Sequence, residues 1–369
     1  MTAAGQGDKA HRVPQPDQPL RRGWTTGACA TAAAKAAYAA LLHGDFPDPV
    51  EIILPRGERP AFALAEAGFL ADGRATAGVV KDAGDDPDVT HGALIRATVR
   101  KLPPGAGLVF RAGEGVGTVT LPGLPLPPGE PAITPGPRAM IAAALAELAG
   151  GAADAEVEIA IPGGEALAER TMNPRLGILG GLSVLGTTGI VRPYSGRAWF
   201  HSIHRGIDVA RAAGLGHLAG ATGATSESAV QALYGLPEQA LIDMGDFVGG
   251  MLKYLRAHPV ARVTVAGGLA KLTKLAQGRL DLHSRRGAVD LAALAGLAQQ
   301  HGADAALAAL IARANTALEA FSLAAAEGVA LPQAVATAAR ATAAAAVEGT
   351  GIAVDIALFD RDGALLARA

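Results

Sequence analysis

The sequence predicts two domains: an N-terminal α+β domain with a mixed or antiparallel sheet over residues 21–195, and a C-terminal Rossmann-like α/β domain over residues 196–369. Three observations support this prediction. The chain has 369 residues, enough for two hydrophobic cores. Between residues 50 and 110, short strand-like runs are separated by Pro- and Gly-containing turns, as in antiparallel sheets. After residue 196, strands and helices alternate, which is typical of a parallel sheet covered by helices.

Composition excludes several classes of protein. The formal net charge is −2, so no basic surplus indicates nucleic-acid binding. The single Cys29 excludes an intramolecular disulfide and a Cys-based zinc site. No apolar run is long enough to span a membrane, and residues 1–20 are polar and predict a disordered leader without a signal core. We therefore expect a cytoplasmic protein with neither nucleic acid nor membrane as partner. A homo-oligomer is an open alternative, because the sequence does not indicate whether the protein dimerises.

The N-terminal domain is predicted to begin with a helix over residues 28–42, a run rich in Ala and Leu. Thr25 or Thr26 is expected to cap this helix, and Gly44 to end it. Gly27 leaves two interpretations open: a simple capped helix, or a helix whose first N–H groups an anionic ligand can reach. The other expected elements are strands over 50–54, 61–70, 75–80, 92–100, 108–110 and 156–161, and a helix over 138–150.

Residues 81–92, KDAGDDPDVTHG, form what we call the Asp loop. Its four Asp residues do not have the spacing of an EF-hand, and the closing Glu is missing. One interpretation is a solvated turn stabilised by Asp side chains. The other is an acid/base edge, because Lys81, the acids and His91 lie together between two strands.

Residues 171–195, which we call the Gly-rich segment, combine glycines with Leu, Ile and Val, unlike a flexible linker. The backbone here is expected to be buried and closely approached. It is interpreted either as a packed connection between the domains, which the composition favours, or as a row of N–H groups facing an anionic ligand.

In the C-terminal domain, three predicted strands end in residues suited to binding a nucleoside. The first ends in GATGATSE over 220–227, the second at Asp243 about twenty residues later, and the third in VAGGLAKL over 265–272. This layout predicts a cradle for a nucleoside whose ribose bonds the acid, although G-x-G-x-x-G is absent and the glycines also fit a packing role. The elements expected here are strands over 216–222, 240–243, 261–266 and 352–359, helices over 197–213, 226–233, 247–257, 269–277 and 332–347, and two helices within 289–327.

Other catalytic motifs are missing from the sequence: there is no Walker motif, no H-E-x-x-H, no G-x-S-x-G and no Cys beside a His. His201 and His204 share a predicted helix but have no third ligand nearby in sequence, so we interpret them as surface or packing residues. These absences favour chemistry performed by aligning a reactive cofactor with a substrate.

The motifs together resemble those of the cobalt-precorrin-5B C1-methyltransferase family. The resemblance runs in order from about Arg21 to Arg286 and includes RRGWTTGACATAAAKAA, the Asp loop, EGVGTVTLPGLPLPPGEPAI, NPRLGILGGLSVLGTTGIVRPYS, the TG-x-TSE turn at 222–227, MGDFVG and AGGLAKLTKLAQG. It implies transfer of a methyl group from S-adenosylmethionine to C1 of a corrinoid precursor, giving cobalt-precorrin-6A in cobalamin biosynthesis. Cobalt is then expected only inside the substrate, with no metal site on the protein.

Site residues are assigned on this basis. Catalysis is expected of Asp82, Asp86 and His91, and cofactor binding of Gly220, Thr222, Gly223, Asp243 and Gly267. Substrate binding is expected of Thr25, Thr26, Gly27, Lys81, Thr90, Gly186, Thr187 and Thr188, with Arg22, Arg138, Arg175 and Arg192 available for the carboxylates of the corrinoid rim. Clustered acids can acquire a raised pKa, which is the reason for assigning the Asp loop to chemistry.

Two rival functions use the same features. A dinucleotide-dependent oxidoreductase acting on a tetrapyrrole would also place an acid at a ribose. A non-catalytic tetrapyrrole carrier would use the Gly-rich surfaces for binding alone. Neither rival explains the ordered set of family motifs.

Overall fold

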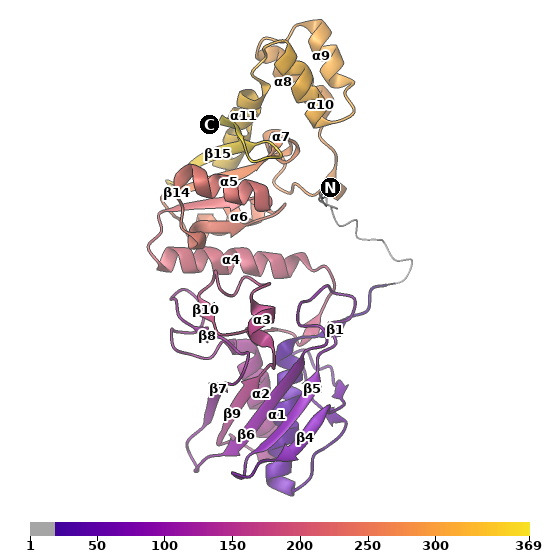
Figure 1. Cartoon of the computed structure of the whole chain (residues 1–369), viewed down its shortest axis with the longest axis vertical. Coiled ribbons are helices and arrows are strands. Elements are labelled where there is room, and N and C mark those ends of the chain that lie inside the picture. Colours follow the sequence, from indigo (N-terminus) through magenta and orange to yellow (C-terminus); the bar gives the residue numbers. More distant parts are fainter. Residues whose placement is uncertain (1–18) are drawn as a thin grey trace, which may run out of the picture. The chain divides into compact units, whose positions relative to one another are not determined.

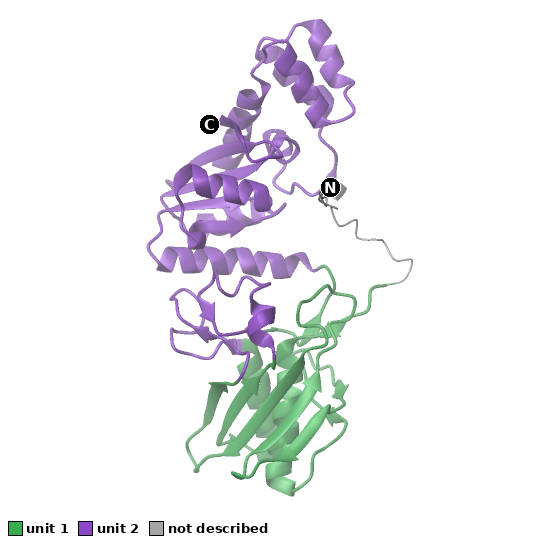
Figure 2. Ribbon diagram, viewed as in Figure 1, with its two compact units in different colours: residues 1–113, 136–162, 184–194 green, residues 114–135, 163–183, 195–369 purple. Residues whose placement is uncertain are grey.

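A computed structural model describes residues 19–369, which form two compact units (Figure 2). Unit 1 comprises residues up to 113, 136–162 and 184–194, and unit 2 comprises 114–135, 163–183 and 195–369. The predicted leader, residues 1–20, lies almost entirely outside the described residues.

Neither unit is a continuous stretch of chain. Residues 114–135 and 163–183, which fall within the predicted N-terminal domain, belong to unit 2. Strand pairing explains this, because β8 (Thr118–Val119) pairs with β10 (Ile178–Leu179) and the side chains around them pack with Val209 of α4 (Gly196–Ala212). The short helix α3 (Gly164–Ala168) lies in the same part of unit 2.

Unit 1 is built on a mixed five-stranded sheet, which confirms the predicted sheet type. Its strand order is β4 (Glu66–Phe69), β5 (Ala75–Val80), β6 (Leu94–Lys101), β9 (Ala155–Ala160) and β7 (Leu108–Ala112). Neighbouring strands are antiparallel except β7 and β9, which are parallel. Two short antiparallel pairs complete the unit: β1 (Gly23–Trp24) with β11 (Ile190–Val191), and β2 (Val50–Glu51) with β3 (Ala61–Phe62).

Two helices cover one face of this sheet (Figure 1). α1 (Thr26–His43) packs along β5 and β6, and its Ala-rich sequence lets the backbone lie close to the strands. α2 (Pro135–Ala149) lies beside α1, where Lys35 Nζ of α1 is 2.8 Å from Glu147 Oε2 of α2. Thr25 caps α1 and Gly44 ends it in the left-handed region at φ 85°, as predicted.

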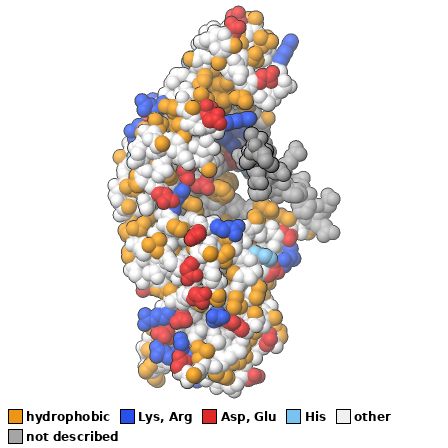
Figure 3. All heavy atoms as spheres, viewed as in Figure 1, with side chains coloured by type: hydrophobic (Ala, Val, Ile, Leu, Met, Phe, Trp, Pro, Cys, Tyr) orange, Lys and Arg blue, Asp and Glu red, His pale blue; other side chains and the backbone are white. Residues whose placement is uncertain are grey.

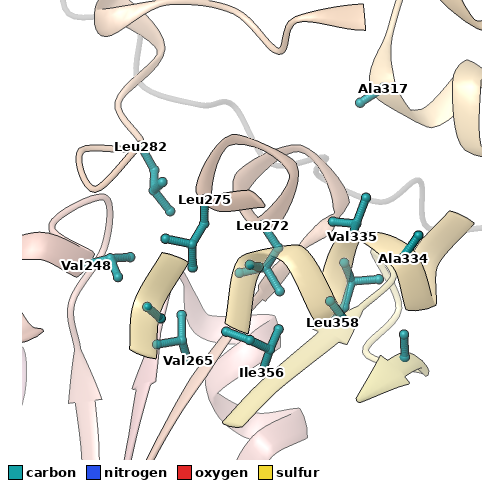
Figure 4. Close-up of a cluster of buried hydrophobic side chains, with 14 of the residues drawn as sticks. Val248, Val265, Leu272, Leu275, Leu282, Ala317, Ala334, Val335, Ile356 and Leu358 are labelled. Atoms are coloured by element: carbon teal, nitrogen blue, oxygen red, sulfur yellow. The ribbon is translucent and has the colours of Figure 1, made fainter. Parts of the chain in front are cut away.

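Unit 2 contains a second five-stranded sheet, with the order β13 (Leu241–Asp243), β12 (His217–Ala221), β14 (Arg262–Gly268), β15 (Ala353–Phe359) and β16 (Leu365–Arg368). The first four strands are parallel and β16 is antiparallel. Side chains alternate between the faces: Ala266 and Phe359 pack with α5 (Ala224–Tyr234). On the other face, Val265 and Leu272 of α7 (Leu269–Ala276) belong to one buried cluster, drawn in part in Figure 4. This core also includes residues of α4, α6 (Val248–Ala257) and α11 (Leu331–Ala346).

Residues 289–327 form three helices where the sequence predicted two. They are α8 (Leu291–Gln300), α9 (Ala305–Ala312) and α10 (Ala317–Ala326). The Ala-rich sequence hides the breaks, but Asp304 caps α9 at Leu307 N (2.7 Å) and Thr316 caps α10 at Glu319 N (3.1 Å). Short 3₁₀ turns occupy Glu238–Ala240 and Ser284–Arg286.

The surface carries charges of both signs. On the face shown in Figure 3, Lys and Arg are interspersed with Asp and Glu, in keeping with a formal net charge of −2 for the chain. Within residues 19–369, every helix is too short or too polar to cross a membrane.

Candidate functional site

The carboxyl ends of β12 and β14 form the centre of the candidate site in unit 2. The two strands are neighbours, and Thr222 N donates to Ala266 O at 3.0 Å. The chain continues from β12 to β13 on one side and reaches β14 on the other, so the strand order reverses at this point. In open α/β sheets, ligands bind in the crevice at such a point.

The predicted glycines at this edge have different roles. A Cβ on Gly267 would lie 2.9 Å from Thr222 Oγ1. The ends of β12 and β14 can therefore approach each other closely only because residue 267 has no side chain. Gly223 is exposed, with no atom within 4 Å of an added Cβ. Gly220 is buried, and a Cβ there would lie 2.4 Å from Met251 Sδ, so Gly220 is required by core packing. The expectation that Gly220 lines a ligand site is not supported by this geometry.

Asp243 ends β13 at the same edge, close to a second acid and an Arg. Arg175 donates two hydrogen bonds to Glu227, at 2.9 and 2.8 Å, and both side chains are mostly buried. Burial raises the pKa of Asp243, and the nearby Glu227 carboxylate raises it further, whereas the Arg175 guanidinium opposes the shift. Arg175 is held by Glu227, and this ion pair competes with the contact that we expect Arg175 to make with the corrinoid rim.

Two lysines of α7 also lie near this edge. Lys271 forms an ion pair with Asp246, which follows β13. Lys274 is buried and donates to Leu282 O at 3.0 Å, and burial lowers its pKa. Lys271 therefore neutralises the loop after β13, while Lys274 holds the turn at Leu282 against α7.

In unit 1, the N-terminus of α1 is closed by the Gly-rich segment. Gly27 N donates to Leu185 O at 3.0 Å, and Ala28 N donates to Thr25 Oγ1 at 3.2 Å. Thr26 Oγ1 accepts from Leu185 N at 2.9 Å. Gly27 itself packs against Pro137: a Cβ added at Gly27 would lie 2.6 Å from Pro137 Cγ. The expectation that Gly27 opens this helix end to a ligand is therefore wrong, because the first turn is capped and covered.

The glycines of the Gly-rich segment serve close packing of protein against protein. A Cβ on Gly186 would lie 2.3 Å from Thr25 Oγ1, and one on Gly181 would lie 2.3 Å from Gly115. Thr188 Oγ1 accepts from Ile190 N at 3.3 Å, while Thr187 is exposed. These contacts agree with the packed interpretation, and Thr187 is the member of this set whose side chain faces solvent.

Lys81 and Thr90 of the Asp loop form a buried structural cluster. Lys81 is 1% exposed, and its Nζ lies 2.7 Å from Asp88 Oδ2. Thr90 donates to Asp88 Oδ1 through its backbone N (2.8 Å) and its hydroxyl (2.6 Å). The prediction that Lys81 and Thr90 contact the substrate conflicts with this burial, because both side chains are used to hold the loop closed.

The remaining acids of the loop are also anchored. Asp82 forms an ion pair with Arg21 and accepts from Gly84 N at 2.9 Å. The hydrogen bond from Arg21, with that from Gly84, lowers the pKa of Asp82 to about 2. Asp86 accepts from Tyr194 N at 2.8 Å. The expected raised pKa is therefore wrong for Asp82, since a neighbouring cation stabilises its charged form.

His91 is the exposed ring of the Asp loop. Its Nδ1 accepts a hydrogen bond from Ala83 N at 3.1 Å, and because a backbone N–H can only donate, this nitrogen carries no proton. The neutral ring therefore carries its proton on Nε2, which suits His91 to donate a hydrogen bond to a ligand.

Of the two histidines of α4, His201 is exposed and His204 takes part in packing, which agrees with the interpretation as surface or packing residues. His204 stacks on Tyr254 with ring centroids 3.8 Å apart, and Tyr254 stacks in turn on His258. Within the described residues 19–369, no three His, Cys, Asp or Glu side chains are grouped as a metal site requires.

Sequence reasoning missed Trp199 and the pairing of Glu227 with Arg175. Trp199 lies on α4, and its Nε1 donates to Asp243 O at 3.0 Å. The signal was present: two adjacent aromatic residues, Trp199 and Phe200, occur near the start of this helix in a chain that is poor in aromatic residues. Glu227 and Arg175 stand in two of the family motifs, but only the fold brings them together.

Comparison with known proteins identifies the family. Residues 13–193 match the CbiD family, and residues 281–369 match the CbiD, C-terminal domain family. Proteins named cobalt-precorrin-5B C(1)-methyltransferase from Agrobacterium fabrum and Bradyrhizobium sp. are each 64% identical, over 95% of this chain and 93% and 94% of theirs. The protein of that name from Methylorubrum extorquens is 63% identical over 94% of this chain and 97% of its own.

A crystal structure of a cobalamin biosynthesis protein (cbiD) from Archaeoglobus fulgidus is 27% identical, with a TM-score of 0.39, and the match covers 72% of this chain and 83% of that one. The identity to the three methyltransferases extends over nearly the whole length of each chain. This chain belongs to the CbiD family of cobalt-precorrin-5B C(1)-methyltransferases.

Proposed function

We propose that this protein transfers the methyl group of S-adenosylmethionine to C1 of cobalt-precorrin-5B, giving cobalt-precorrin-6A. The observation that carries the proposal is the 64% identity to two proteins of that name over 95% of this chain. The cobalt ion belongs to the substrate. When bound, S-adenosylmethionine supplies an electrophilic methyl group, so the task of the protein is to bind and orient both reactants and to exclude water.

The cofactor site is assigned to the carboxyl edge of the unit 2 sheet, which we interpret as Rossmann-like. The close approach of Gly267 and Thr222 and the exposed Gly223 leave backbone accessible where the strand order reverses. α5 begins after Gly223 without a side-chain cap, so its first N–H groups can receive the carboxylate of the methyl donor. Among the described residues, no Lys or Arg forms an ion pair with Asp243, whose carboxylate can accept the ribose hydroxyls.

Replacing Asp243 tests this assignment. Asp243→Ala removes charge-assisted hydrogen bonds worth about 1.5–3 kcal/mol, so affinity for S-adenosylhomocysteine should fall roughly tenfold to hundredfold in calorimetric titration. Asp243→Asn keeps the shape of the side chain and removes its charge, so it tests the charge alone. Titration with NADH tests whether the site prefers a dinucleotide. Unchanged affinity in a folded Asp243→Ala protein would move the cofactor site elsewhere.

The reaction itself is tested by the position of the transferred carbon. The protein is incubated with deuteromethyl-labelled S-adenosylmethionine and the corrinoid precursor, and the label is located by mass spectrometry and NMR. We expect it at C1. Label at another ring carbon would overturn the proposed reaction, and binding of both ligands without transfer would indicate a carrier.

We assign the Asp loop to the corrinoid substrate, with His91, Asp86 and Asp82 as the residues nearest to chemistry. The exposed His91 presents Nε2–H as a donor for a substrate carboxylate or for charge on the macrocycle. Asp82 positions the loop, because its backbone O accepts from Trp24 N at 2.7 Å and its carboxylate holds Arg21. Gly186, Thr187 and Thr188 stay assigned to substrate binding, with Thr187 the exposed member.

Two variants separate chemistry from stability in this loop. His91→Ala should melt as the wild type does and bind S-adenosylhomocysteine normally, but should slow single-turnover methylation about 10²-fold or more. Asp82→Asn should lower the melting temperature and leave turnover per folded molecule closer to normal. Normal methylation by His91→Ala would exclude a catalytic role for this residue.

A further inference from the structure

A cavity of about 240 Å³ lies beside Asp243 in unit 2. Arg175 and Asp243 supply charged groups at its wall. Most of the lining is apolar and comes from α4, β13 and residues 172–176: Met172, Leu176, Trp199, Ile203, Leu241 and Ile242. Sites for drug-sized ligands have volumes of roughly 300–1,000 Å³, so this cavity suits one small ring system and is too small for a tetrapyrrole with its carboxylate arms.

Trp199 forms a fixed, half-exposed aromatic wall of this cavity. Its indole Nε1 donates to Asp243 O at 3.0 Å, and the ring edge lies 3.0 Å from where a Cβ on Gly245 would be. The side chain is nevertheless 43% exposed. Packing in the core does not account for a large aromatic residue that is oriented by a hydrogen bond yet open to solvent on one side. Such a ring is suited to stacking on a flat, apolar ligand.

The position of Asp243 identifies the ligand. Asp243 is assigned above to the ribose of the methyl donor, and it also lines the cavity. The base of a nucleoside is attached directly to its ribose, so a nucleoside whose ribose hydroxyls bond Asp243 holds its base one sugar ring from the carboxylate, within reach of this apolar space. Arg175 does not compete for the base, because its guanidinium already donates two hydrogen bonds to Glu227 and a third, at 3.5 Å, to Glu238.

We propose that the cavity between α4, β13 and residues 172–176 takes the purine ring of the methyl donor, with Trp199 as its stacking surface. This inference rests on the proposed function. It gives α4, which precedes the sheet in the chain, a role in recognising the cofactor. It also explains why residues 172–176 of the Gly-rich segment are held at the sheet edge by the ion pair between Arg175 and Glu227.

The test uses the full-length protein and two ligands that differ only in the base: S-adenosylhomocysteine and S-ribosylhomocysteine, which lacks the purine. We expect Trp199→Ala to weaken binding of S-adenosylhomocysteine about tenfold to hundredfold and to leave binding of S-ribosylhomocysteine unchanged. Trp199→Phe keeps an aromatic face and should show a smaller loss. Each variant is checked for wild-type circular dichroism and melting.

Fluorescence provides an independent readout, because the chain has two Trp residues. S-adenosylhomocysteine should quench Trp199, so quenching should persist in Trp24→Phe and disappear in Trp199→Phe. Unchanged affinity of Trp199→Ala for S-adenosylhomocysteine, or equal weakening of both ligands, would overturn the purine site. If the purine site were overturned but Asp243→Asn still weakened binding of S-adenosylhomocysteine, the proposal that the protein binds this cofactor at Asp243 would stand. Absence of S-adenosylhomocysteine binding by the wild type would overturn both.

Discussion

Single residues in the Asp loop show how neighbours decide what a carboxylate can do. Asp82, Asp86 and Asp88 are close in sequence, yet Asp82 pairs with Arg21, Asp86 accepts from a backbone N–H, and Asp88 pairs with the buried Lys81. Each acid therefore has a different hydrogen-bond donor as its partner. The loop is thus a support that presents His91, and the pKa values of Asp82 and Asp88 are lowered and not raised.

The ion pair of Asp82 makes stability depend on pH. The pKa of Asp82 is about 2 in the folded protein, below its ordinary value of 3.8, so its charged form stabilises the fold above pH 3.8. That contribution is lost as the pH falls through about 2. The melting temperature of Asp82→Asn should therefore lie below that of the wild type above pH 3.8, and the two should converge by about pH 2. The effect is modest because the side chain is 42% exposed. A difference that persists unchanged at pH 2 would contradict this account.

At the scale of elements, the Ala-rich helices α1 and α8 differ in how much space surrounds their glycines. α1 is buried along residues 26–40, and the first turn at Gly27 touches Pro137, Met140 and Leu185. α8 lies partly exposed, and Gly296 within it has open space around an added Cβ. The same substitution should therefore have opposite effects in the two helices.

We predict that Gly27→Ala destabilises the protein by about 1–3 kcal/mol, because the new methyl group overlaps Pro137 Cγ, 2.6 Å from the ideal Cβ position. Gly296→Ala should stabilise it by about 0.5–1 kcal/mol, since Ala is the better helix former and nothing obstructs it. Free energies of unfolding from urea titration measure both. A neutral Gly27→Ala would mean that Pro137 and the start of α1 can move apart without cost.

At the scale of the whole molecule, the chain passes between the units at 113–114, 135–136, 162–163, 183–184 and 194–195. The Gly-rich segment contains two of these passages, so its two halves belong to different units. The candidate cofactor residues all lie in unit 2, and the Asp loop lies in unit 1. Binding of the cofactor should consequently stabilise unit 2 and leave the stability of unit 1 unchanged.

Hydrogen exchange checks this division. S-adenosylhomocysteine at about 100 times its Kd contributes roughly 2.7 kcal/mol of stabilisation to the state that binds it. We expect slower exchange at residues 221–223, 243–246 and 267–269, and no change at residues 81–92. Protection of the Asp loop by the cofactor alone would reassign that loop from the corrinoid to the methyl donor.

Local sequence patterns predicted much of the fold. β5 has the predicted bounds, α1 has the predicted cap and end, and the resemblance to the methyltransferase family is confirmed. The three helices within 289–327 were counted as two, because Ala fits every face of a helix and leaves no periodic pattern to mark a break. The sequence does not predict β16 at all, because residues 365–368 are a short run that follows directly on a turn.

The sequence by itself determined the family, the parallel and mixed sheets and the strand ends that carry glycines and Asp243, because these depend on residue type and local spacing. Only the tertiary structure decided which polar groups remain free. Gly27 is covered by Leu185, Lys81 is buried on Asp88, and Arg175 is held by Glu227, each through a partner distant in sequence. The same long-range packing brings Trp199 to Asp243 and creates the cavity beside it. Burial and pairing are properties of the folded chain, so no local pattern in the sequence contains them.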